Sequence, residues 1–156
     1  MNPSKAVLLS LSFLICSTAQ SIEDSPFNTV QNLFAAMSAF DHSRMEAVVT
    51  DDFQLLEAGE VWDIDTLIKE IGPNENAYER RNYFSLIRMV SRNETMWISY
   101  WNKATFTVSD KIFENAWLES VVLVEDQGSW KIQLMHSTIV SLENVPTDVT
   151  FEEYID

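Results

Sequence analysis

Residues 113–140 read FENAWLESVVLVEDQGSWKIQLMHSTIV, which is two apolar-rich runs separated by the polar cluster 125–129. Strand-forming residues on both sides of a polar, glycine-containing turn predict a β-hairpin whose loop is longer than two residues. A loop at 126–129 places Glu125 opposite Trp130. This hairpin decides the fold, because its register determines which side chains face the core.

Counting outward from that turn gives the register of the two strands. The predicted opposed pairs are Leu123–Ile132, Val121–Leu134, Glu119–His136 and Trp117–Thr138. Directly opposed residues share a face of the sheet, so one face is apolar near the turn and carries an acid and an imidazole at its far end. Burying such groups is costly unless they are paired. We therefore expect Glu119 and His136 to form a pair that borders a pocket.

The last strand of the hairpin also carries a family pattern. Its residues Trp130, His136 and Thr138 match W-x-I/V-x-x-x-H-x-S/T, and the strand resembles that of the nuclear transport factor 2-like superfamily, in particular the SnoaL-like and calcium/calmodulin-dependent kinase association-domain branches. Asp41 and the run Asp51-Asp52-Phe53 also resemble residues usual in that superfamily. The resemblance implies an α+β, cystatin-like cone, in which a strongly curved antiparallel sheet wraps around N-terminal helices and encloses a cavity. Such a fold hosts isomerases, hydratases, transport factors and oligomerisation modules alike, so it does not define one function.

The first 19 residues have the features of a secretory signal peptide. A lysine precedes the apolar run 6–16, and the small residues Ser17 and Ala19 come before Gln20. The apolar run is too short to serve as a mature membrane anchor. Lipidation of Cys16 is the alternative, but no small residue stands just before it. We predict cleavage after Ala19 and an exported bacterial protein, periplasmic or secreted.

Charge and cysteine content narrow the class of function. The formal net charge is −14 at pH 7, and removal of the signal peptide lowers it further. Such an acidic chain repels phosphate backbones and anionic lipid heads, so we expect no binding of nucleic acid and none of membranes after signal cleavage. The single cysteine lies within the predicted signal peptide. The mature chain therefore has no disulfide and depends on its core.

Hydrophobic periodicity predicts one domain at 27–141, between a flexible leader at 20–26 and a loosely held acidic tail at 142–156. The elements predicted before the hairpin are helices at 27–40, 43–49 and 66–71 and strands at 53–57, 60–62, 83–91 and 95–108. Asp41 and Ser43 are interpreted as caps between the first two helices, and Asp65 as the cap of the third.

The predicted strand 95–108 has two unlike faces. Its even positions are mostly apolar and are expected to face the core, whereas Trp97 and Trp101 lie on the opposite face. Two tryptophans on a nominally exposed face need cover. We interpret this outer face as a homodimer interface, as the superfamily resemblance implies. The alternative is that the strand crosses to the other side of the cone at a bulge.

Several kinds of catalytic site lack the residues that they need. Only His42 and His136 can supply imidazole, and neither has a second His or Cys at ligand spacing, so no metal is expected. All three glycines are turn residues and none belongs to a phosphate loop, so no cofactor is expected. Ser137 adjoins His136, but neighbours on a strand point to opposite faces, which argues against a Ser-His-acid triad.

Glu119 and His136 remain as the candidate acid/base pair. A carboxylate that orients an imidazole can transfer protons near neutral pH, with Tyr100 or Asn102 donating a hydrogen bond to a developing oxyanion. The alternative is a structural brace between the last two strands. Both interpretations place the two side chains in contact.

The predicted ligand-binding residues are Tyr100, Asn102, Trp117, Trp62 and Arg88. Trp62 and Trp117 fit either a ligand cavity or ordinary core packing. Arg88 fits a ligand carboxylate, a cavity acid or a solvated edge.

Three functions are consistent with these features. The leading hypothesis is an exported, dimeric domain whose cavity binds a small, largely apolar molecule. The second is an isomerase, dehydratase or hydrolase that uses Glu119 and His136. The third is a non-catalytic assembly module that makes its contact through Trp97 and Trp101.

Overall fold

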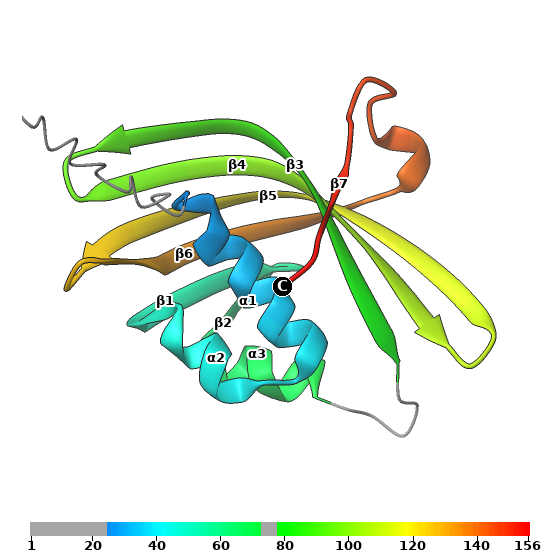
Figure 1. The fold of residues 1–156 in the computed structure, drawn as a ribbon, viewed down its shortest axis with the longest axis horizontal. Helices are drawn as coiled ribbons and strands as arrows, with labels where there is room; N and C mark the ends of the chain where they lie inside the picture. Colours follow the sequence, from blue (N-terminus) through cyan, green and yellow to red (C-terminus); the bar gives the residue numbers. More distant parts are fainter. Residues whose placement is uncertain (1–24, 73–77) are drawn as a thin grey trace, which may run out of the picture.

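The computed structural model describes residues 25–72 and 78–156, and within these two ranges a curved sheet covers a group of helices (Figure 1). The helices are α1 (Phe27–Ala39), α2 (His42–Ala47) and α3 (Ile64–Ile71), followed late in the chain by the short 3-10 helix η1 (Leu142–Asn144). The strands are β1 (Val49–Glu57), β2 (Glu60–Trp62), β3 (Glu79–Arg92), β4 (Thr95–Val108), β5 (Lys111–Asp126), β6 (Ser129–Val140) and β7 (Glu152–Tyr154). The predicted signal peptide at 1–19 lies outside the described residues.

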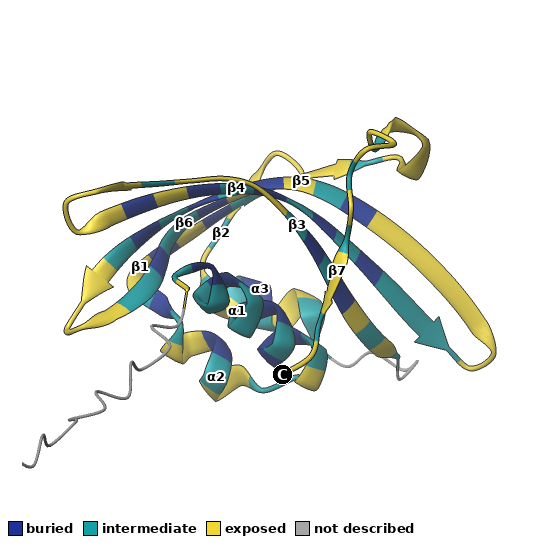
Figure 2. Cartoon of the chain, turned by 45° about the horizontal axis from the view of Figure 1, so that its top comes forward, coloured by how far each residue is buried: buried dark blue, intermediate teal, exposed yellow. Residues whose placement is uncertain are grey.

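The seven strands of the described ranges form one sheet in the order β2-β1-β6-β5-β4-β3-β7. Strands β3 to β6 form an antiparallel meander, and α1, α2 and α3 lie on the concave side of the sheet (Figures 1 and 2). The predicted α+β cone is confirmed. The sheet is mixed rather than wholly antiparallel, because β1 pairs with β6 in parallel while its other edge forms a hairpin with β2.

The core lies between α1 and the concave face of the sheet. Val30 and Leu33 of α1 are fully buried against the alternate positions of β4, including Ile98 and Tyr100. The prediction that the even positions of this strand face inward is therefore confirmed, and Trp97 lies on the outer face with 42% of its surface exposed. Burying large apolar side chains in this way is the main stabilising contribution to the fold.

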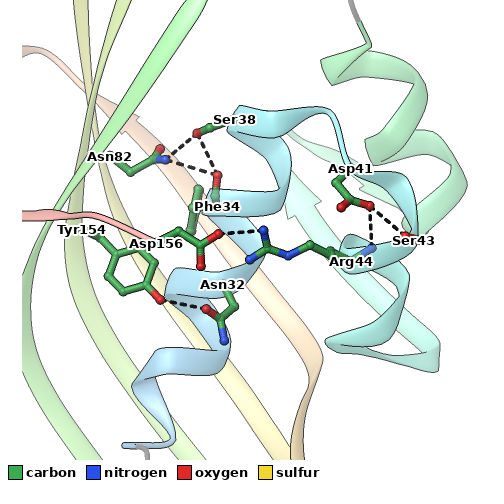
Figure 3. A network of polar contacts seen from close by, with 9 residues as sticks. All are labelled: Asn32, Phe34, Ser38, Asp41, Ser43, Arg44, Asn82, Tyr154 and Asp156. Carbon is green, nitrogen blue, oxygen red and sulfur yellow. Dashed lines mark hydrogen bonds and ion pairs between the residues drawn. The ribbon is translucent and has the colours of Figure 1, made fainter.

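Two side-chain caps determine where the shorter helices begin. Asp41 accepts a hydrogen bond from the backbone N–H of Arg44 at 3.1 Å and another from the Ser43 hydroxyl at 2.8 Å, which confirms Asp41 as the cap before α2 (Figure 3). The prediction that Ser43 is also a cap is wrong, because the helix begins at His42 and contains Ser43. The predicted cap of α3 is wrong. Asp63, not Asp65, accepts from the N–H of Thr66 at 2.8 Å, because the helix begins at Ile64 and leaves Asp65 in its first turn.

The β5–β6 hairpin has the predicted register only near its turn. Glu125 faces Trp130 and Leu123 faces Ile132, as expected, but β6 then contains one residue more than β5, Gln133. Beyond this β-bulge the observed pairs are Val122–Leu134, Val121–Met135, Ser120–His136, Glu119–Ser137, Leu118–Thr138 and Trp117–Ile139. An extra residue moves every later side chain of the strand to the other face. The predicted pairing of Glu119 with His136 is therefore wrong.

The C-terminal segment is tied to the fold, so the prediction of a loosely held tail is wrong for residues 152–156. Its strand β7 pairs with β3 across Asn82–Phe84. The Tyr154 hydroxyl donates to Asn32 Oδ1 of α1 at 2.8 Å, and Asp156 forms an ion pair with Arg44 at 2.7 Å (Figure 3). The segment thus joins the edge of the sheet to the first two helices.

A search of the helices in the described ranges finds none that is long and apolar enough to cross a membrane.

Candidate functional site

A cavity of about 200 Å³ lies between the helices and the concave face of the sheet. Its apolar wall consists of residues from α1, α3, β1 and β6, namely Phe34, Met37, Leu55, Leu67, Ile71 and Met135. Its polar end is formed by Arg80, Asn102, Glu119 and Ser137. Glu57, the last residue of β1, also lines the cavity. The space is therefore apolar along most of its length and charged at one end.

Four of the predicted site residues meet in this cavity. Trp62, Trp117, Asn102 and Glu119 all line it, although they come from β2, β5 and β4. Tyr100 is directly opposite Glu119 in the β4–β5 ladder and is fully buried behind the cavity wall. The hydrophobic alternation of β4 positions Tyr100 and Asn102, because both occupy even, inward-facing positions.

Glu119 is the central acid of the site. It is 4% exposed, and its Oε1 accepts a hydrogen bond from the Ser137 hydroxyl at 3.0 Å. Burial disfavours the charged carboxylate and raises the pKa of Glu119 to about 7, against the opposing effect of its hydrogen-bond donors and of Arg80. At neutral pH this carboxyl group is therefore present in both the protonated and the ionised form.

Several polar atoms around this carboxyl group are unsatisfied. Tyr100 and Asn102 lie close enough to favour the charged form of Glu119. However, the Tyr100 hydroxyl, both polar atoms of the Asn102 amide and Glu119 Oε2 are buried and form no well-aligned hydrogen bond with another described residue, although Tyr100 and Asn102 interact with the Glu119 carboxyl group. A buried polar group without a partner costs about 1–3 kcal/mol. The site therefore holds donors and acceptors that a bound molecule can satisfy.

Arg80 is a site residue that the sequence did not reveal. It is half-buried in the cavity wall, with its guanidinium 5.3 Å from the ring centres of both Phe34 and Phe106. Burial lowers the pKa of Arg80 to about 10, although the charge of Glu119 acts in the opposite direction. It was missed because the strand was expected to begin at residue 83. Because β3 begins at Glu79, Arg80 alternates with Asn82 and Phe84 along the strand, and its side chain points to the same inner face.

Arg88 does not line the cavity. A bulge between Leu86 and Arg88 turns its side chain to the outer face, where it is exposed and lies 5.8 Å from the ring centre of Trp97. In a regular strand without that bulge, Arg88 would lie on the same face as Phe84 and Leu86. Of the alternatives open from the sequence, the solvated edge is the one observed.

His136 lies on the opposite side of the sheet from Glu119. It is exposed and borders an open surface groove of about 450 Å³ beside the β1–β2 turn. Ser137, which the sequence argument assigned to the wrong face, occupies the place beside Glu119 instead. The predicted acid-imidazole contact is absent, so neither the dyad nor the brace exists as predicted.

No group of three or more His, Cys, Asp or Glu side chains within residues 25–72 and 78–156 is arranged to hold a metal ion. The cationic and acidic groups of the cavity are Arg80, Glu57 and Glu119. Chemically, this set can bind an oxygen-bearing group, and Glu119 can take up or release a proton near neutral pH.

Comparison with protein-family models finds no match, and comparison with curated proteins finds none either. Solved structures do share the fold. An NTF2-like protein from Cytophaga hutchinsonii is 17% identical with a TM-score of 0.61, over 73% of this chain and 94% of that one. A ketosteroid isomerase-like protein from Erwinia carotovora atroseptica is 18% identical with a TM-score of 0.59, over 73% and 92%.

The CamKII hub homology domain of Chlamydamonas reinhardtii is also similar, at 15% identity and a TM-score of 0.64, over 74% of this chain and 95% of that one. Identities this low establish the architecture and leave the activity open. The chain has the nuclear transport factor 2-like fold, and the resemblance predicted from its last strand is confirmed.

Proposed function

We propose that this chain is an exported domain whose cavity binds a small, mostly apolar molecule through one oxygen-bearing end. The observation that carries the proposal is the set of buried polar atoms without a well-aligned hydrogen bond on Asn102 and Glu119, which line a largely apolar cavity, and on Tyr100, which is paired with Glu119 in the sheet. A ligand that supplies the missing hydrogen bonds gains their free energy without desolvating new protein groups. A cavity of about 200 Å³ suits a ligand smaller than most drugs.

The test is native mass spectrometry of the protein purified from its own host, compared with the variant Asn102→Leu. We expect a bound small molecule in the wild type and its loss in the variant, because leucine fills the space but offers no hydrogen bond. Ser120→Ala, on the outer face, is the matched control and should retain the ligand. A wild-type protein that carries nothing, and binds no member of a fragment library at Asn102 by NMR, would contradict ligand binding.

A second candidate, proton-transfer catalysis, is favoured by the pKa of about 7 at Glu119. In this function the Glu119 carboxylate removes a proton next to a substrate carbonyl, and Tyr100 or Asn102 donates a hydrogen bond to the oxygen that becomes negative. An isomerase reaction is complete when the protonated Glu119 returns this proton to another carbon of the substrate, and a dehydratase reaction when it gives the proton to the departing hydroxyl group, which leaves as water. The acid would act without His136, which lies across the sheet.

Glu119→Gln distinguishes catalysis from binding. If Glu119 is the base, the variant should lose turnover of an identified substrate by a factor of at least about 100, since general-base catalysis contributes about 10²–10⁴-fold, while substrate affinity stays nearly unchanged. His136→Gln should leave turnover as it is. Equal activity in Glu119→Gln and wild type would rule out this mechanism and leave the binding function standing.

Exposed apolar side chains on the outer face of the sheet favour a homodimer that forms through this face. Trp97 and Leu118 are exposed there at 42% and 41%, and Trp101 is half-buried on the same face. Among the fold neighbours are a hub homology domain and the association domain of C. elegans CaMKII, whose names describe assembly. Trp97→Lys combined with Trp101→Lys should give a monomer by sedimentation. Val61→Lys, an exposed site on the edge strand β2, is the control, and a dimer that persists in the double variant would exclude this interface.

Export rests on the N-terminal sequence. The apolar run 6–16 and the small residues Ser17 and Ala19 suit cleavage before Gln20 by a signal peptidase. The mass of the mature protein from its own host should correspond to a chain that begins at Gln20. A mass that includes residues 1–19, or a lipid on Cys16, would contradict it.

A further inference from the structure

We infer that Asn82 is a positioning residue that holds the Arg80 guanidinium in the cavity wall and so fixes its approach to the Glu119 carboxyl. The inference deepens the proposed function, on which its relevance to ligand binding rests. It concerns how the polar end of the cavity is built, and it can be tested on the protein without a ligand.

Asn82 is buried and uses its whole amide group. Its Nδ2 donates to the Phe34 carbonyl oxygen at 3.2 Å and to Ser38 Oγ at 2.7 Å (Figure 3), and its Oδ1 accepts from Arg80 Nε at 2.8 Å. The Ser38 hydroxyl donates its own proton to the Phe34 carbonyl at 2.9 Å, which leaves Ser38 Oγ free to accept. Reversing the amide would set oxygen against two acceptors and NH₂ against a donor, so only this orientation is satisfied.

The Arg80 guanidinium is therefore restrained in two directions. The ring centres of Phe34 and Phe106 each lie 5.3 Å from it, and Asn82 accepts a hydrogen bond from its Nε. Arg80 forms no ion pair within residues 25–72 and 78–156, and its terminal nitrogens make no hydrogen bond there.

A competing position for this side chain exists. Arg80 also borders an outer groove of about 520 Å³, whose rim carries the acids Glu153 and Asp156 of the C-terminal segment. A guanidinium released by Asn82 can move towards these carboxylates and into water, which favours its charge. The hydrogen bond to Asn82 is what keeps the cation on the cavity side.

The position of Arg80 matters because its charge acts on Glu119. Burial raises the pKa of Glu119, and the positive charge of Arg80 opposes that rise. The other titratable groups that face Glu119 are Tyr100 of β4 and Glu57 of β1, while α1 and α3 contribute only apolar side chains to the cavity. Moving Arg80 outward therefore removes the cation that, among the described residues, stabilises the Glu119 carboxylate.

The experiment is a pH titration of the Glu119 carboxyl carbon by NMR in the ligand-free protein. In Asn82→Ala the midpoint should rise by about one pH unit above the wild type, the low end of the effect of a nearby opposite charge. Arg80→Met should shift it at least as far in the same direction. Ser38→Ala removes one Asn82 acceptor but keeps the contact with Arg80, and should titrate like the wild type. An unchanged midpoint in Asn82→Ala or in Arg80→Met would overturn the inference.

A measurement on the wild type covers the case in which Asn82→Ala does not fold. The Nε–H of Arg80 should exchange with solvent at least tenfold more slowly than that of Arg92, an exposed arginine at the end of the same strand. Equal exchange rates would overturn the inference. Because no ligand is used, failure here leaves ligand binding intact, and failure to find a ligand leaves this result intact.

Discussion

Glu119 and His136 lie one register step apart on neighbouring strands, yet their surroundings have little in common. Glu119 faces the concave side, where it is 4% exposed, accepts from Ser137 and has a pKa of about 7 because burial disfavours its charge. His136 faces the convex side, where water reaches it at the edge of an open groove. The face of the sheet, more than the type of residue, decides which of the two can take part in chemistry, since at these two positions only the concave face removes water.

The largest expected effect of this difference is on stability. Ile132 is fully buried on the concave face just before the bulge, whereas Ile139 is 63% exposed near the end of the same strand. Ile132→Ala should lower the free energy of unfolding by about 4 kcal/mol, through lost burial and the cavity that remains. Ile139→Ala should change it by less than about 0.5 kcal/mol. Urea denaturation monitored by circular dichroism measures both, and equal losses would mean that the two faces are equally buried in solution.

The second prediction concerns the pH dependence of stability. The pKa of Glu119 is about 7 in the folded state and about 4.5 in the unfolded chain, so between these values only the folded state keeps the proton. The protonated, buried Glu119 side chain thus contributes to the free energy of unfolding. This contribution is fully present below pH 4.5 and is lost as the pH rises through 7, a loss on the order of 3 kcal/mol in all.

Glu119→Gln should remove this pH-dependent loss, whereas His136→Gln should keep it. The measurement is the free energy of unfolding from urea titrations at pH 4 to 8, taken as the difference between each variant and the wild type. A difference curve for Glu119→Gln that stays flat across this range would show that the carboxyl is hydrated in the folded protein.

The contrast between the faces also explains what the sequence could reveal. Apolar alternation located the strands, and the turn at 126–129 correctly paired Leu123 with Ile132. A bulge has no clear signature in a single sequence, because Gln133 fits either a regular strand or an extra residue. One unforeseen residue was enough to exchange His136 for Ser137 beside Glu119.

The two arginines of β3 show the same limit. The sequence offers Arg88 as a candidate for the cavity, but this side chain lies outside; Arg80 has no such signal in the sequence and lies inside. The first error comes from a bulge before Arg88, and the second from a strand that begins four residues before its apolar pattern does. Asn102, Trp62 and Trp117 line the cavity and Tyr100 lies on the inner face behind it, because regular alternation or simple apolar burial determines their positions.

A smaller effect is expected from the hydroxyl group that replaces the predicted imidazole. Ser137→Ala removes the donor to Glu119 Oε1, and because this hydrogen bond lowers the pKa of Glu119, that pKa should rise above about 7. The variant should lose about 1–2 kcal/mol of stability at pH 8, where the carboxylate needs its donor most. Thr138→Val, which removes a hydroxyl from the exposed neighbour, should cost less than about 0.5 kcal/mol. The carboxyl stretch in infrared spectra reports the pKa, and an unchanged titration in Ser137→Ala would contradict the hydrogen bond.

The smallest expected effect is the loss of stability when Arg88 is replaced, because its surroundings differ from those of Arg80. Arg88 is exposed and contacts one ring, Trp97, at 5.8 Å, whereas Arg80 is half-buried and contacts two rings, each at 5.3 Å. In the monomer water solvates Arg88, so at concentrations where the protein is monomeric its cation–π contact is worth only about 0.5 kcal/mol. Arg88→Met should destabilise the protein by that amount relative to Arg92→Met, and added salt should reduce the difference.

The same measurement bears on the outer face as an interface. A loss of more than about 2 kcal/mol in Arg88→Met would be typical of a desolvated cation–π contact. The Arg88–Trp97 face would then be covered in solution, and the loss should fall as the protein is diluted if the cover is a second copy of the chain. A small loss that does not depend on protein concentration would instead place Arg88 outside any interface, and would confine a dimer contact to the part of the face around Trp101 and Leu118.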